Sequence, residues 1–343
     1  MTNKAIPQVD HLLLLVGGNP LPNAVAGRLL VQPGGTVSLL YSEQTMTIKD
    51  RLAKWLQRAI TPQPIIREKK VEEANPFSIY QGVMAEVKAV NAPTAHLHYT
   101  GGTKAMSVYA YLASKHWAEQ KSSVKFQASY LDSHTLSLVF DPVDPASGQK
   151  PKTTYVGLTR SFNLVEDLLA LHGWELLCPV NQQPVLPLTT AALVDIHTNY
   201  SKTSEWYHWL KGPNREWKTE PRPPVDLPTH AQLVAVTKTL HQELELENCQ
   251  LHPSKAAHLF TPCPEKRKPN GEIETPEELF LRWLGGGWLE NYVLRVLQAT
   301  NLGLRVYQGV ETKSPRFEVD VAAIHGYQLF LFSCTTLTDK VSY

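Results

Sequence analysis

The 343-residue sequence has few cysteines, almost no net charge and no long hydrophobic run. Its four cysteines lack a Cys-x-x-Cys spacing, which disfavours a zinc site or a disulfide framework and favours a reducing compartment. The net charge of +1 does not indicate nucleic-acid binding, although a basic groove in one domain would be averaged away. The run HLLLLVGG is far shorter than the roughly 20 residues that cross a membrane. We therefore expect a cytoplasmic protein without a membrane span.

What is present is typical of a folded protein. Hydrophobic residues make up 43% and charged residues 19% of the chain, which provides enough apolar material for well-packed cores. The length exceeds that of an average domain and fits two domains.

The first half alternates apolar runs with amphipathic stretches. The continuous apolar run from Val9 to Val16 is typical of a strand buried on both faces of a parallel sheet. Further strands are expected at 36–42, 95–100, 124–132 and 135–140, and helices at 20–30, 48–60, 76–90 and after Lys104. This order predicts a doubly wound α/β sheet, with any ligand at the carboxyl ends of its strands.

Three polar loops should meet at that edge. They are GGNPLPN after the first strand, SEQT after the second and TGGTK after a later one. Their glycines let the backbone approach a ligand, and the helices that follow direct free N–H groups and a positive dipole end toward it. Lys104 adds a positive charge, so the expected ligand is an anion, most simply a phosphate. Neither the Walker pattern nor the dinucleotide fingerprint is present in these loops.

Two stretches carry a family resemblance. LLLLVGGNPLPNAVAG and YTGGTKAMSVYAYLA resemble the CARF sensor domain of type III CRISPR-associated ancillary proteins, in particular the group with a restriction-enzyme-like nuclease at its other end. The resemblance covers roughly residues 9–140. It implies a homodimer whose two sensor domains bind a cyclic oligoadenylate, most often the tetra-adenylate, across a two-fold axis.

The resemblance also assigns ligand-binding positions. They are Gly18, Asn19, Pro20 and Asn23 from the first loop, Ser42, Glu43 and Thr45 from the second, and Thr100, Gly101, Gly102, Thr103, Lys104 and Met106 from the third. For Met106, core packing at the start of its helix is an equally good interpretation. His96 and His98 alternate on a strand and could suggest a metal site, but histidines that face a helix layer are the more common case.

The middle of the chain is less informative. A stretch rich in proline, glycine and polar residues suggests a boundary near residue 150. We expect a sensor domain at 1–150, a helical connecting region at 151–264 and a nuclease-like core at 265–343. Trp206, Tyr207, Trp209 and Trp217 lie among basic residues and could stack nucleic-acid bases, although packing is the more common role. The basic EKRKPNG segment, 265–271, reads as a solvated hairpin, with phosphate contact as the minority interpretation.

The last eighty residues contain a second site. Two helical pieces broken by Gly285–Gly287 are followed by strands at LRVYQGV, RFEVDVAAI and LFLFSC, with Glu290 in the first turn of the second helix. Asp320 lies within an apolar strand, where an unpaired carboxylate is costly and a metal ion would remove the cost. This order resembles the PD-(D/E)xK nuclease core, which implies that Glu290 and Asp320 hold Mn²⁺ or Mg²⁺ for catalysis.

The third motif departs from that core. Where the resemblance calls for acid-x-lysine, the chain has Ser333-Cys334-Thr335, so Ser333 and Thr335 occupy catalytic positions without the charges. Lys340 is a candidate replacement for the lysine. The sequence stops at Tyr343, where such cores usually continue, so we expect an incomplete or truncated nuclease core.

The sequence thus predicts a cyclic oligoadenylate-activated, metal-dependent nuclease that cuts DNA, RNA or both in antiviral defence. One alternative is a sensor with an inactive effector domain, favoured by the altered third motif. The other is a ring nuclease that cleaves the cyclic nucleotide in the sensor pocket, which ranks last because no obvious general base accompanies Thr100, Thr103 and Lys104.

Overall fold

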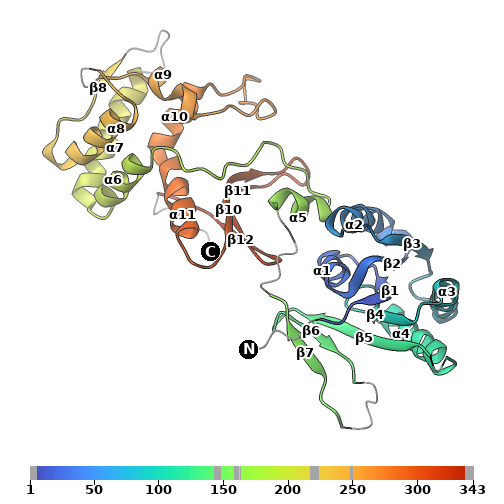
Figure 1. The fold of residues 1–343 in the computed structure, drawn as a ribbon. Coiled ribbons are helices and arrows are strands. Elements are labelled where there is room, and N and C mark those ends of the chain that lie inside the picture. Colours follow the sequence, from blue (N-terminus) through green and yellow to red (C-terminus); the bar gives the residue numbers. More distant parts are fainter. Residues whose placement is uncertain are drawn as a thin grey trace. The chain divides into compact units, whose positions relative to one another are not determined.

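The structure is a computed structural model that describes residues 6–121, 123–142, 148–157, 162, 164–216, 224–247 and 250–336. The chain divides into two compact units, one made of Met1–Glu175 with Gly326–Gln328 and the other of Leu176–His325 with Leu329–Tyr343. Figure 1 shows the elements of each unit.

The first unit is built on a seven-stranded sheet with the order β3-β2-β1-β4-β5-β6-β7. Its strands are β1 (Val9–Leu15), β2 (Val31–Tyr41), β3 (Ile65–Lys70), β4 (Thr94–His98), β5 (Lys125–Asp132), β6 (Ser137–Phe140) and β7 (Lys152–Tyr155). The five strands from β3 to β5 are parallel, whereas β6 and β7 continue the sheet in antiparallel fashion. The expected doubly wound α/β fold is therefore confirmed.

Five helices accompany this sheet among the described residues. They are α1 (Leu21–Leu30), α2 (Met46–Ala59), α3 (Pro76–Val90), α4 (Lys104–Glu119) and α5 (Val165–Leu171), with a short 3-10 turn, η1 (Glu43–Thr45), before α2. Leu13 and Leu15 of β1 share a core with buried residues of α3 and α4. Leu12 and Leu14, which alternate with them, are also fully buried. The apolar run of β1 therefore reflects burial on both faces of the sheet.

Two strands of this sheet lie outside the sequence prediction. The strand β3 reads IIREKK and is largely exposed, so it lacks the continuous apolar pattern of a buried strand. The strand β7 begins at Lys152, where the sequence suggested a domain boundary, and pairs with β6. The first unit consequently extends past residue 150, because strand pairing continues beyond the polar segment.

The second unit begins with helices and ends in a small sheet. The helical elements are α6 (Pro187–His197), α7 (Tyr200–Glu216), η3 (Ala231–Leu233), α8 (Val234–Glu243), α9 (Pro253–Ala256), η4 (Ala257–Leu259), α10 (Pro276–Arg282) and α11 (Trp288–Gln298), with the π-helical turn η5 (Trp283–Gly287) between the last two. The strands are β8 (Val225–Asp226), β9 (Gln250–Leu251), β10 (Arg305–Glu311), β11 (Glu318–His325) and β12 (Gln328–Phe332). The glycine break between two helical pieces and the three final strands match the prediction.

The expected connecting region is not a separate linker. Leu193, Trp206 and Leu240 share one hydrophobic core with Phe280 and Trp288, which belong to α10 and α11. The segment from residue 176 onward therefore folds as one unit with the start of the expected nuclease-like core. Trp206 is fully buried in this core and Trp209 packs against it, which supports the packing interpretation, whereas Trp217 lies outside the described residues.

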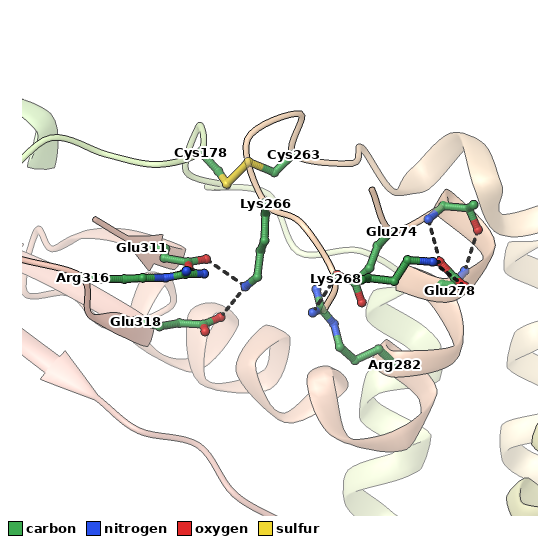
Figure 2. A network of polar contacts seen from close by, with 11 residues as sticks. Cys178, Cys263, Lys266, Lys268, Glu274, Glu278, Arg282, Glu311, Arg316 and Glu318 are labelled. Atoms are coloured by element: carbon green, nitrogen blue, oxygen red, sulfur yellow. Dashed lines mark hydrogen bonds and ion pairs between the residues drawn. A yellow bond between two sulfur atoms is a disulfide. The ribbon is translucent and has the colours of Figure 1, made fainter. Parts of the chain in front are cut away.

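One expectation about the cysteines is wrong. Cys178 and Cys263 form a disulfide, with Cα atoms 5.6 Å apart and a sequence separation of 85. Figure 2 shows this bond beside a group of charged side chains. A pairing over such a separation leaves no local spacing signal, so it could not be found from cysteine intervals.

Candidate functional site

The loops after β1 and β4 meet at the carboxyl edge of the parallel sheet. A Cβ atom added to Gly17 would lie 2.7 Å from the backbone nitrogen of Gly102, and one added to Gly101 would lie 2.0 Å from the carbonyl oxygen of Leu15. Both distances are too short for a side chain, so the two backbones are in direct contact. The predicted convergence is thus confirmed for the first and third loops.

Asn23 stabilises this contact between the two loops. Its Nδ2 donates a hydrogen bond of 2.7 Å to the Leu15 carbonyl, and the side chain is fully buried. The family resemblance implied that Asn23 lines the ligand. The structure instead buries it under the loop, where it holds the end of β1 and the start of α1 together.

The first loop leaves two residues open to solvent. Gly18 and Asn19 are exposed, whereas Pro20 is buried. The Oδ1 atom of Asn19 accepts a hydrogen bond of 3.0 Å from the N–H of Leu21. This bond satisfies one of the free donors at the start of α1 and fixes the exposed turn.

The predicted ligand-binding residues at the start of α4 differ in exposure. Thr103 caps the helix, since its Oγ1 accepts from the N–H of Met106 at 3.2 Å and donates to the carbonyl of Glu73 at 2.9 Å. Lys104 is exposed and has no ion pair with a described residue. Met106 is buried in the core of α3 and α4, so the packing interpretation is the one the structure supports.

Thr100 uses its hydroxyl oxygen within the protein. The N–H of Leu131 donates to Oγ1 over 2.6 Å, and Nε2 of His98 lies 2.9 Å from the same oxygen. The sequence offered no general base beside Thr100, whereas the structure brings His98 there. Burial lowers the pKa of His98 to about 3, so its imidazole is neutral and a weak base. His96 is also fully buried and contacts Ser129, in line with a packed strand histidine.

The second loop is held by its own hydroxyl groups. The N–H of Ser42 donates to Oγ1 of Thr45 over 3.0 Å, and Ser42 itself is buried. Glu43 is exposed and forms an ion pair with Lys70 at the end of β3. A ligand that contacted Glu43 would therefore compete with Lys70.

A fourth loop, residues 71–75, reaches the same edge and was missed. It follows β3, whose polar sequence hid the strand. The N–H of Val71 donates to the carbonyl of Tyr41 at 2.9 Å, and Glu73 accepts the bond from Thr103. The loops that end β2, β3 and β4 are therefore linked by hydrogen bonds.

The second unit brings together Glu290 and Asp320. Glu290, in the first turn of α11, is half-buried, and its Oε2 accepts a hydrogen bond of 3.0 Å from Nε2 of Gln308. Burial raises the pKa of Glu290 to about 7, and the nearby Asp320 carboxylate contributes in the same direction. The two carboxyl groups, from a helix and from β11, therefore lie close enough to interact electrostatically.

The third motif supplies hydrogen-bond donors in place of charges. The backbone N–H of Cys334 lies 2.5 Å from Oδ2 of Asp320, and Oγ of Ser333 donates to the same atom at 3.2 Å. The structure thus places Ser333 against Asp320, while Thr335 is exposed and Lys340 lies outside the described residues. Among the residues that the structure describes, no three His, Cys, Asp or Glu side chains group closely enough to hold a metal ion.

Two carboxylates still fit a hard divalent cation. Mg²⁺ usually keeps several waters and binds through one or two carboxylates together with substrate phosphates. A cation between Glu290 and Asp320 would also remove the repulsion that helps to raise the pKa of Glu290. The donor set therefore fits Mg²⁺ or Mn²⁺ in number and type.

The basic hairpin beside this site is internally paired. Figure 2 shows Nζ of Lys266 between Glu311 and Glu318, at 2.8 and 3.0 Å from their carboxylate oxygens. Lys268 lies 3.1 Å from Glu278 in the capping box of α10. These lysines therefore neutralise neighbouring glutamates, which supports the hairpin interpretation of 265–271 over a phosphate contact.

Comparison with known proteins gives likenesses in structure alone. No family model matches the sequence, and no curated protein does either. The fold is similar to that of Can2 from Sulfobacillus thermosulfidooxidans in complex with cyclic tetra-adenylate, with a TM-score of 0.60, 19% identity, and coverage of 95% of this chain and 80% of that one.

A second similar structure is the protein VC1899 from Vibrio cholerae, with a TM-score of 0.61, 15% identity, and coverage of 94% of this chain and 78% of that one. Among the described residues, no helix is both long enough and apolar enough to span a membrane. The likenesses extend over nearly the whole chain, so this protein shares the fold of Can2 and VC1899.

Proposed function

We propose that this protein is a nuclease of type III CRISPR defence that a cyclic oligoadenylate activates. The observation that carries the proposal is the meeting of the β1 and β4 loops at the carboxyl edge of the sheet, where α1 and α4 begin and Lys104 is exposed. A likeness to Can2, whose structure holds cyclic tetra-adenylate, supports the same ligand here. The protein would act in the cytoplasm, where the cyclic oligoadenylate would be synthesised and bound.

The ligand would be held by groups that remain accessible. Gly18, Asn19, Gly102 and Lys104 are exposed at two helix starts, so their backbone N–H groups, the amide of Asn19 and the ammonium of Lys104 would contact phosphates. Asn23, Thr103 and Met106 would act indirectly, because their side chains are occupied in holding the loops.

A homodimer would complete the site. Val108 and Leu112 of α4 are 54% and 48% exposed, and their spacing of four residues puts both on one face of the helix. With Tyr99 and Tyr111 they line a cavity of about 350 Å³ on the helix that begins at Lys104. Pairing two copies through this face would bury the apolar side chains and bring two copies of the loops to one two-fold ligand.

The effector site would use Glu290 and Asp320 to hold Mn²⁺ or Mg²⁺. The bound ion would activate water and neutralise charge on a substrate phosphate of DNA or RNA. The N–H of Cys334 and the hydroxyl of Ser333 orient Asp320, and Gln308 orients Glu290. Ligand binding would favour the dimer geometry that is competent to cut, which requires tighter binding to that geometry.

The first test is cleavage of labelled single-stranded DNA and RNA and of supercoiled plasmid by the purified full chain. It compares Mn²⁺ or Mg²⁺ with EDTA, with and without cyclic tetra-adenylate. We expect cutting that needs both metal and ligand and that Asp320→Ala abolishes. Glu318→Gln, on the same strand and still able to accept from Lys266, is the matched control and should keep activity. Cutting by Asp320→Ala, or without ligand, would contradict the proposal.

A second candidate is a cyclic oligoadenylate sensor without nuclease activity. The neutral Ser333 and Thr335 favour it, because neither replaces the charge of acid-x-lysine. Ligand binding by calorimetry, with no cleavage of any of the three substrates, would establish this reading. Linear adenylate products formed without metal would instead indicate a ring nuclease.

A further inference from the structure

A chain of buried polar side chains runs beneath the third ligand loop. Nε2 of His96 lies 2.7 Å from Oγ of Ser129, and Nδ1 of His98 lies 3.1 Å from the same oxygen. Nε2 of His98 then meets Oγ1 of Thr100 at 2.9 Å. His96, His98 and Ser129 are fully buried, so the contacts among these three residues are shielded from bulk water. Strand β4 supplies the two histidines, and its neighbour β5 supplies the serine.

The direction of these hydrogen bonds follows from one unpartnered atom. Nδ1 of His96 is buried and has no hydrogen-bond partner among the described residues. A buried N–H without an acceptor costs about 1–3 kcal/mol, so the proton of this neutral imidazole belongs on Nε2, where Ser129 accepts it. The Ser129 hydroxyl has its own proton left to donate, and Nδ1 of His98 is the acceptor it faces.

The donor and acceptor roles at Thr100 follow in the same way. Because Nδ1 of His98 accepts from Ser129, its proton lies on Nε2 and is donated to Oγ1 of Thr100. That oxygen also accepts from the N–H of Leu131 at 2.6 Å. Both lone pairs of the hydroxyl are then used, and its proton remains for a partner outside this network. Thr100 is half-buried at the start of the TGGTK loop, where a ligand would supply that partner.

We propose that His96, Ser129 and His98 form a relay that makes Thr100 an obligatory hydrogen-bond donor to the bound nucleotide, with Ser129 and His98 as positioning residues. The inference rests on the proposed function, since it names how that ligand is read. A hydroxyl held in this way favours an acceptor, such as a phosphate oxygen, and disfavours a ligand donor.

The relay can be tested without any ligand. In protein labelled with ¹⁵N-histidine, long-range ¹H–¹⁵N correlation spectra distinguish the two neutral tautomers. We expect the Nε2–H form for both His96 and His98, assigned by comparison with His96→Gln and His98→Gln. An Nδ1–H form at either position would reverse the donor chain and overturn the inference.

The consequence for binding is measured by calorimetry with cyclic tetra-adenylate. Thr100→Val keeps the shape but removes the donor, and should weaken binding about tenfold or more, as expected for a hydrogen bond to a charged group. Thr100→Ser restores the hydroxyl and should bind within about twofold of the wild type. Ser129→Ala should weaken binding and remove the tautomer preference of His98.

Ser114 provides the matched control. It is equally buried, but its hydroxyl has no hydrogen-bond partner among the described residues, so Ser114→Ala should leave binding unchanged. If the wild type binds and both Thr100→Val and Ser129→Ala bind equally well, the inference is wrong. If the wild type does not bind cyclic tetra-adenylate, the proposed function fails, and the tautomer spectra still decide the relay.

Discussion

The backbone N–H of Cys334 lies 2.5 Å from Oδ2 of Asp320. The segment that follows β12 thus orients the carboxylate through its main chain as well as through the Ser333 hydroxyl. Ser333 and Thr335 on either side are exposed, so a larger side chain at either position can extend into solvent.

This geometry allows the altered motif to be restored. In Ser333→Glu/Thr335→Lys, a third carboxylate and a lysine flank a main-chain contact that is already in place. If the missing charges limit catalysis, metal-dependent cleavage should rise at least about tenfold, a gain of roughly 1.4 kcal/mol in transition-state stabilisation. Initial cleavage rates would be measured, with Ser333→Gln/Thr335→Met as the neutral control. Equal rates in both double variants would show that the charges are not limiting.

Lys104 and Met106 should separate binding from stability. Lys104→Ala removes an exposed charge and should weaken cyclic tetra-adenylate binding, with a shallower salt dependence and unchanged unfolding. Met106→Ala leaves a cavity in the α3–α4 core and should lower the free energy of unfolding by about 2–5 kcal/mol. Calorimetry at two salt concentrations and urea unfolding measure the two effects. A stability loss in Lys104→Ala would argue against its role in binding.

Gly101 and Gly18 offer a matched pair in the ligand loops. Gly101→Ala would force a Cβ to within 2.0 Å of the Leu15 carbonyl and should lower stability and binding together. Gly18→Ala has no atom within 4 Å of the added Cβ, so the fold should be unaffected. Thermal unfolding and ligand titration of both variants test this contrast. Equal stability of the two variants would mean that the β1 and β4 loops are not in contact.

The disulfide should stabilise the second unit. Cys178 and Cys263 close a long loop, and the loss of such a constraint is expected to cost about 4.6 kcal/mol by the chain-entropy model. Urea unfolding with and without a reductant measures the effect. Cys178→Ser/Cys263→Ser should match the reduced wild type and should not respond to the reductant. An oxidised wild type no more stable than this double variant would contradict the prediction.

Three buried histidines should make the first unit sensitive to acid. Burial lowers the pKa of His11 to about 4 and those of His96 and His98 to about 3. The unfolded chain takes up these protons as the pH falls below about 6.5, while the folded chain does not. Stability is therefore complete above that pH and is lost as the pH falls toward the folded values.

The expected loss approaches about 1.4 kcal/mol per pH unit for each histidine. Asp141, whose pKa is raised by burial, acts in the opposite direction but is a single group. Hydrogen exchange of amides in β1 and β4 between pH 7 and 5, corrected for intrinsic rates, reports on this unit alone. Protection that does not change over this range would contradict the assignment of neutral histidines.

The sequence predicted the elements that carry strong local patterns. The apolar run of β1, the glycine loops after β1 and β4 and the glycine break before α11 all appear in the structure as expected. Asp320 was singled out because a carboxylate within an apolar strand is conspicuous, and Glu290 because its place in the first turn of a helix resembles that of the nuclease core. By contrast, β3 was missed because it is an edge strand with four charged side chains in a row, which hide the apolar pattern of a strand.

Roles that depend on contacts between distant residues could not be predicted in this way. The sequence alone determined the alternation of strands and helices and the chemical character of the ligand loops, because periodicity and residue type act locally. Only the tertiary structure decided that Asn23 and Met106 are buried and that Cys178 pairs with Cys263, and only it brought Ser129 to His98. Burial and hydrogen-bond partners are set by which strands and loops become neighbours, and that information lies in no single segment of the chain.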